Sequence, residues 1–129
     1  MRDFLSSNSS LMMEKSMGFL WTKQAAILDN IANAETPNYK AKVVTFEESL
    51  KDKLERAQET ATPKKTVRGV LEDTPFAVTE QLESTRMDDN GVNVTEQSLE
   101  MVRNAYQLQY VMQAISSDLT RLRTAVRGQ

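Results

Sequence analysis

The stretch that decides the fold is residues 94–127, which read VTEQSLEMVRNAYQLQYVMQAISSDLTRLRTAVR. Apolar residues recur along it at alternating steps of four and three, which is the heptad pattern of a coiled-coil helix. Neither Pro nor Gly interrupts the stretch, and Asn93, followed three residues later by Glu96, forms a capping box at its start. The seam predicted by this spacing comprises Met101, Ala105, Leu108, Met112, Ile115, Leu119, Leu122 and Val126.

A helix over these residues is too long to fit inside a compact domain of its own. At about 1.5 Å per residue it extends roughly 50 Å, whereas a globule made from a chain of this length is about 30 Å across. The helix therefore has to protrude, pair in a coiled coil, or pack into an assembly.

A second helix is predicted for residues 11–34, and it has to end before Pro37 because the residue that precedes a proline favours extended geometry. Its stripe follows the same alternation of fours and threes through Met13, Met17, Leu20, Gln24, Ile27 and Ile31, and Trp21 and Leu28 widen it. We expect a mainly α fold in which the two terminal helices pair as an antiparallel coiled coil. Polar Gln24 and the many soft Met side chains make this pair marginal, so neighbouring subunits would have to cover the remainder.

The middle segment, residues 35–93, has weaker signals. A short helix is predicted for residues 46–58, after a capping box at 45–48. Residues 66–68 and 76–78 are candidates for short strands, and 89–91 read as a turn. We expect this segment to be irregular or to have minor β structure.

The composition excludes several classes of function. The chain has 129 residues, enough for one domain, and its net charge of −2 gives no electrostatic case for nucleic-acid binding. It has no Cys and no His, which removes thiol nucleophiles, imidazole bases and the common zinc sites. Neighbouring carboxylates such as Glu47 and Glu48 lie in polar or helix-surface stretches and are expected to be solvated. We therefore expect no enzymatic activity, no cofactor and no metal.

The sequence also carries no signal for membrane insertion. No segment approaches 18 consecutive apolar residues, so we expect no direct membrane span. Residues 1–10, MRDFLSSNSS, lack the apolar core and the cleavage site of a secretory signal. We expect this segment to be a flexible N-terminus and the protein to have no cleaved signal peptide.

Residues 28–41, LDNIANAETPNYKA, are not explained by helix propensity. Asn30 and Asn33 are poor helix formers near a helix end. Their amides are expected to bond to backbone groups where the helix stops, or across to another chain. Pro37 then redirects the chain, and Asn38 can adopt the left-handed conformation of a turn.

This segment resembles the signature near the N-terminus of bacterial flagellar rod proteins, within the axial rod and hook group. The Thr-Pro-x-Tyr-Lys-Ala continuation is most similar to that of the proximal rod. Many members have Gly at the position of Asn38, and DDNGVNVTEQ resembles the family's Asp-Gly-Asn-x-Val turn with Asn90 and Gly91 in swapped order. The matching signature residues are Asn30, Ile31, Ala32, Asn33, Thr36, Pro37, Tyr39, Lys40 and Ala41.

The resemblance implies a structural subunit that stacks helically into the drive shaft between motor and hook. The implied partners are other rod subunits and itself, the membrane-ring and rod-base adaptor proteins, and the flagellar type III export apparatus. The implied location is the flagellar basal body, reached without a cleaved signal peptide. The alternatives are another axial rod protein of the group, or a cytosolic helical adaptor or export chaperone. The residues expected to carry helix pairing and assembly are Met17, Leu20, Trp21, Leu28, Ile31, Met101, Leu108, Met112, Ile115, Leu119, Leu122 and Val126.

Overall fold

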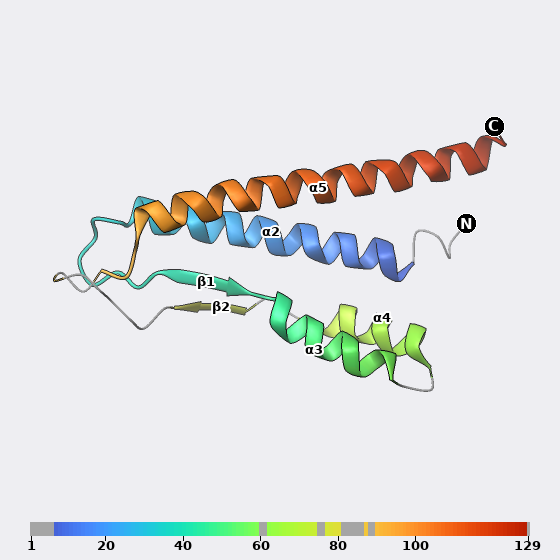
Figure 1. Cartoon of the computed structure of the whole chain (residues 1–129), viewed down its shortest axis with the longest axis horizontal. Coiled ribbons are helices and arrows are strands. Elements are labelled where there is room, and N and C mark those ends of the chain that lie inside the picture. Colours follow the sequence, from blue (N-terminus) through green and yellow to red (C-terminus); the bar gives the residue numbers. More distant parts are fainter. Residues whose placement is uncertain (1–6, 60–61, 75–76, 81–86, 88–89, 129) are drawn as a thin grey trace.

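The computed structural model describes residues 7–59, 62–74, 77–80, 87 and 90–128. The fold is mainly α, as predicted, with two long terminal helices and one small sheet (Figure 1). In chain order the elements are α2 (Asn8–Ala32), β1 (Lys42–Thr45), α3 (Glu47–Gln58), α4 (Pro63–Asp73), β2 (Ala77–Glu80) and α5 (Val94–Arg127).

The two terminal helices, α2 and α5, lie side by side and run antiparallel (Figure 1). Near the end of α2, the Asn30 amide donates to the Gln97 side chain at 3.0 Å. Further toward the start of α2, the Asn104 amide donates to the Leu20 carbonyl at 3.1 Å. Residues later in α2 thus meet residues earlier in α5, which leaves the last turns of α5 beyond the start of α2.

The face of α5 that meets α2 differs from the predicted seam. Buried and half-buried positions recur at alternating steps of three and four through Met101, Asn104, Leu108, Val111, Ile115, Asp118 and Leu122. Of the predicted seam residues, Met101, Leu108, Ile115 and Leu122 are half-buried and lie on this face. The other predicted seam residues, Ala105, Met112, Leu119 and Val126, are exposed. The polar Asn104 takes the place of Ala105 in the contact because its amide finds acceptors on α2.

The stripe predicted on the first helix is also only partly buried. Leu20 is buried and Met17 and Ile31 are half-buried, whereas Trp21 is 59% exposed and Leu28 is 50% exposed. The two side chains that were expected to widen the buried stripe are therefore largely exposed.

Helix α2 begins earlier than predicted. The side chain of Ser7 accepts a hydrogen bond from the Ser10 backbone N–H at 3.1 Å and caps the helix, which starts at Asn8. Residues 8–10 of the predicted flexible N-terminus are thus helical, and residues 1–6 lie outside the described residues.

The middle of the chain is a helical hairpin inserted between two strands. Strands β1 and β2 pair antiparallel, with Lys42 opposite Glu80 and Thr45 opposite Ala77, and α3 and α4 lie between them in sequence. The predicted strand at 66–68 was wrong: Pro63 opens α4, and its Val67, Val70 and Leu71 side chains form an apolar helical stripe. The strand candidate at 76–78 overlaps β2, and residue 76 lies outside the described residues.

The predicted short helix is present as α3, but its start differs. Thr45 belongs to β1, and the residue that precedes the helix is Phe46, which makes no side-chain capping bond. Phe46 is buried instead, with its ring 5.3 Å from the ring of Phe19. The capping box expected at 45–48 is therefore replaced by an aromatic contact that ties α3 to α2.

The main core lies between α2 and the segments below it in Figure 1. Its buried members are Phe19, Leu20, Ala26, Val44, Phe46, Leu50 and Leu71. Helix α5 adds only the half-buried Leu108 and Val111. Most of the circumference of α5 is consequently left uncovered. In the described part of the chain, no helix is both long and apolar enough to cross a bilayer.

Candidate functional site at the exit of the first helix

The loop that follows α2 is held by backbone hydrogen bonds between residues close in sequence. The Asn33 backbone N–H donates to the Asn30 carbonyl at 3.2 Å, and that of Thr36 donates to the Asn33 carbonyl at 3.0 Å. Asn38 has a φ of 61°, the left-handed conformation predicted for it, which Asn tolerates better than most residues. This turn brings the following segment back toward the end of α2.

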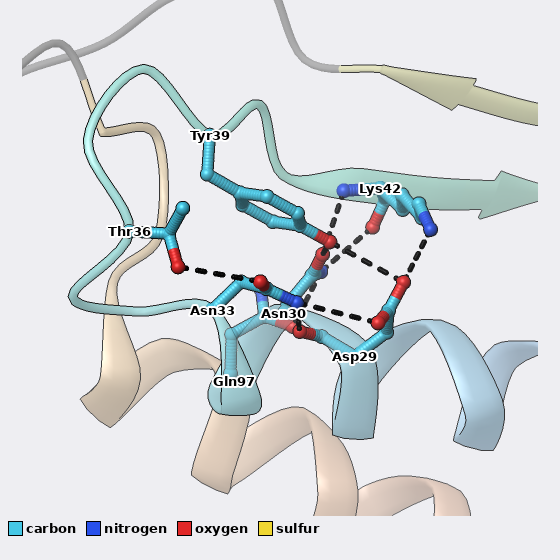
Figure 2. A network of polar contacts seen from close by, with 7 residues as sticks. All are labelled: Asp29, Asn30, Asn33, Thr36, Tyr39, Lys42 and Gln97. Carbon is cyan, nitrogen blue, oxygen red and sulfur yellow. Dashed lines mark hydrogen bonds and ion pairs between the residues drawn. The ribbon is translucent and has the colours of Figure 1, made fainter.

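Asn30 is the centre of the network drawn in Figure 2, and its side chain is 0% exposed. Its amide nitrogen donates to the Lys42 carbonyl at 2.8 Å and to the Gln97 side chain at 3.0 Å. Its amide oxygen accepts from the Lys42 backbone N–H at 2.7 Å and from the Tyr39 hydroxyl at 3.3 Å. One side chain of α2 thereby satisfies both backbone groups of Lys42 in β1 and reaches α5.

An ion pair between Lys42 and Asp29 lies next to the Asn30 amide, on the side of β1. The Lys42 ammonium donates to the Asp29 carboxylate in an ion pair, and the Tyr39 hydroxyl lies 3.4 Å from the same carboxylate (Figure 2). The hydrogen bond from Lys42 lowers the pKa of Asp29, and the same bond raises the pKa of Lys42. Desolvation by burial raises the pKa of Tyr39, so this hydroxyl keeps its proton and acts as a donor.

Asn33, the second Asn of the signature, makes shorter-range contacts. Its amide nitrogen donates to the Asp29 carbonyl at 2.8 Å, and its amide oxygen accepts from the Thr36 hydroxyl at 3.3 Å. These bonds stay within the last turn of α2 and the loop. Asn33 therefore shapes the helix end, while Asn30 joins separate elements.

A third Asn, in the segment that precedes α5, binds the loop that follows α2. Asn90 is buried, and its amide nitrogen donates to the carbonyls of Asn33 at 3.0 Å and Thr36 at 2.7 Å. The Gly91 backbone N–H then donates to the Tyr39 carbonyl at 3.0 Å. The loop after α2 and the segment before α5 are thus fastened together next to a small apolar cluster of Ala34, Ala41, Val92 and Tyr39.

The signature residues do not all have the same surroundings. Asn30 and Ala41 are buried, Ile31, Asn33, Tyr39 and Lys40 are half-buried, and Ala32, Thr36 and Pro37 are exposed. The sequence reasoning missed the partners Asp29, Lys42, Gln97 and Asn90. Asn90 was interpreted only as a turn residue, and the other three stand at ordinary helix or strand positions. The sequence did carry a signal that Asn104 could lie in the helix contact, because an Asn at a helix-pairing position commonly fixes the register of the two helices.

These polar contacts hold separate elements together, and we call the group of Asp29, Asn30, Tyr39, Lys42 and Gln97 the clasp. Its amides and carboxylate are engaged with backbone groups and with one another, so α2, β1 and the start of α5 are held in one geometry. Among the described residues, no group of three or more acidic side chains could hold a metal ion. The site fixes the position of the two long helices relative to each other. The exposed apolar side chains on these helices form a second candidate functional surface.

The fold and this clasp define an elongated helical protein with exposed apolar side chains on its two long helices (Figure 1). No family model matches the chain. The chain is 26% identical over 117 residues to the flagellar basal body rod protein FlgB of Bacillus subtilis (strain 168), a match that covers 90% of this chain and 91% of that protein. This similarity supports a distant relationship to flagellar rod proteins and points to the flagellar basal body.

Proposed function

We propose that this chain is a structural subunit of the proximal rod of the bacterial flagellar basal body. In this role, helically stacked subunits form the drive shaft that transmits torque from the motor to the hook. The observation that carries the proposal is the similarity to a flagellar basal body rod protein over nine-tenths of the chain. The proposed role is structural and requires no enzymatic activity.

The uneven covering of the helix pair supports a role in an assembly. The core lies on one side of α2, and α5 packs along a single stripe. Exposed apolar side chains on both helices, including Trp21, Met112 and Leu119, have no covering element in the described part of the chain. Large exposed apolar side chains gathered on neighbouring helices are typical of protein contact sites. Stacking of subunits would supply the missing partners.

The clasp supports the same role in a different way. A shaft transmits torque only if each subunit keeps its shape, and Asn30 ties the end of α2 to β1 and α5 with hydrogen bonds of 2.7 to 3.3 Å. In this proposal the partners are other rod subunits and further copies of this chain, the membrane-ring and rod-base adaptor proteins, and the type III export apparatus. Export would occur without a cleaved signal peptide.

Deletion in the source bacterium, followed by electron microscopy of purified basal bodies, tests the proposal. We expect the deletion strain to retain the membrane ring and to lack the rod and hook, with both restored by a plasmid copy. We also expect the tagged protein to co-purify with basal bodies. Normal basal bodies in the deletion strain would refute a rod role, and a protein that stays in the cytosolic fraction would indicate an adaptor or export chaperone.

A further inference from the structure

One section of α5 lacks charge around its whole circumference. Residues 104–117, NAYQLQYVMQAISS, contain no Asp, Glu, Lys or Arg, although 26% of the chain is charged. Within this section Tyr106 is 70% exposed and Tyr110 is 74% exposed. Exposed Tyr and Met combined with an absence of charge is the composition of a protein interface rather than of a solvated helix face.

The two tyrosines stand beside an apolar groove of about 650 Å³. Three helices line this groove. Tyr106 and Tyr110 come from α5, Met12 comes from α2, and Leu54 comes from α3. A groove lined by three helices offers room for side chains, or for a helix, of another molecule. Its position next to the uncharged section makes the two one continuous surface.

The charges at the two ends of the uncharged section form a matching pattern. Before it, Glu100 pairs with Arg103 at 2.8 Å and with Lys23 of α2 at 3.0 Å, and after it, Asp118 pairs with Arg121 at 3.4 Å. Arg103 and Arg121 lie seven and eleven residues from Tyr110, on the face of α5 that carries it. The half-buried Glu100 and Asp118 lie at the edge between this face and the one that meets α2. Arg103 and Asp118 are equally far from the midpoint between residues 110 and 111, and so are Glu100 and Arg121.

We propose that a second copy of this chain docks on this surface, with its α5 antiparallel to α5 of the first copy and the two-fold axis near Tyr110. In this arrangement Arg103 faces Asp118 of the second copy, and Glu100 faces Arg121 of the second copy. A parallel pair in register would instead place like charges opposite each other, which is unfavourable. The tyrosines of each copy would lie over the groove of the other.

The pairing does not depend on the proposed rod role, and it goes beyond it. An isologous two-fold contact uses the same patch on both copies and closes after two, so it cannot extend into a shaft of subunits that all point the same way. The pair would be a free form of the protein that covers the apolar face of α5 before assembly. Subunits that stack would have to give up this contact.

Disulfide mapping tests the direction of the pairing, and the chain suits it because it has no Cys. In the antiparallel pair, residue 107 of one copy faces residue 114 of the other. A mixture of the purified Gln107→Cys and Ala114→Cys proteins should therefore form mixed disulfide dimers on mild oxidation. Neither variant should cross-link to itself, because its two thiols would be about 10 Å apart along the helices, beyond disulfide reach. Self-cross-linking of each variant alone would overturn the antiparallel arrangement.

Sedimentation equilibrium of the purified full chain tests the surface itself. Tyr110→Glu should abolish the dimer, because it places two charges next to the two-fold axis. Arg103→Glu should weaken the dimer about tenfold, because two exposed ion pairs become repulsive by symmetry. Adding Asp118→Arg should restore most of that loss, and Arg123→Glu, on another face of the same helix, is the matched control and should leave the dimer unchanged. A wild-type chain that stays monomeric at several hundred micromolar would overturn the proposal, as would Arg103→Glu behaving like the control.

Discussion

Replacing Asn30 by Ala is the sharpest test of the clasp. The substitution removes four hydrogen bonds made by one buried side chain, two to the backbone of Lys42 and one each to Gln97 and Tyr39. The Lys42 backbone N–H and carbonyl thereby lose the side-chain partner that α2 gives them. We therefore expect β1 to lose its fixed position against α2.

The magnitude follows from the kinds of bonds that are lost. An intramolecular hydrogen bond contributes about 1 kcal/mol net, and a stranded polar group costs about 1–3 kcal/mol when it stays buried. The two backbone bonds of Lys42 dominate, because Gln97 and Tyr39 are half-buried and can turn toward water. We expect Asn30→Ala to lower the free energy of unfolding by about 2–4 kcal/mol.

Asn33→Ala is the matched control, because it removes the other signature Asn. Its side-chain bonds to Asp29 and Thr36 stay within the last helical turn and the adjoining loop. Its expected cost is about 0.5–1 kcal/mol, the range for a local helix-end bond.

Urea unfolding followed by circular dichroism measures both variants. All proteins should be compared at one concentration, because association shifts apparent stability. If Asn30→Ala lies within about 0.5 kcal/mol of the wild type, or costs no more than Asn33→Ala, then Asn30 does not join the elements as argued.

Three further outcomes are expected. Leu20→Ala should cost about 2–4 kcal/mol in urea unfolding because Leu20 is 4% exposed, and Trp21→Ala, at an exposed site, should cost less than about 1 kcal/mol; equal costs would contradict the described helix contact. NMR titration should give Asp29 a pKa below its ordinary 3.8, with a return toward that value in Lys42→Met. Because the folded-state pKa is the lower one, this stabilisation is present above about pH 4 and is lost as the pH falls through the folded value. Leu119→Asp should prevent rod assembly in cells without lowering the helix content of the purified chain, since Leu119 is exposed, and normal basal bodies in that strain would count against an assembly role.

The parts of the fold that could be predicted are those with local causes. Heptad spacing and a capping Asn93 place the last helix at 94–127, where the structure has it, and Asn93 accepts from the backbone N–H groups of Thr95 and Glu96. Asn38 takes its left-handed turn close after α2. Helix α4 was missed because its β-branched residues suggested a strand, and only the packing of its apolar stripe on the core favours a helix there.

The helix seam shows where local reasoning stops. Apolar residues occupy two adjacent stripes on α5, so the spacing alone allows two faces. The folded chain uses the one with Asn104, whose amide donates to the Gln24 side chain at 2.7 Å. An isolated helix contains nothing that makes a polar residue preferable to Ala105 at this contact.

By itself, the sequence determined that both ends of the chain are helices, where the first one stops, and which residues form its exit turn. Backbone propensities and caps act within about one helical turn, so neighbouring residues suffice to specify these features. Only the tertiary structure decided which side chains complete the clasp, since the bonds of Asn30 to Lys42 and Gln97 cross 12 and 67 residues of sequence. It also decided which stripe of α5 is buried and which stays exposed. These outcomes depend on which faces meet and which buried polar groups find partners, and that is settled only when the whole chain packs together.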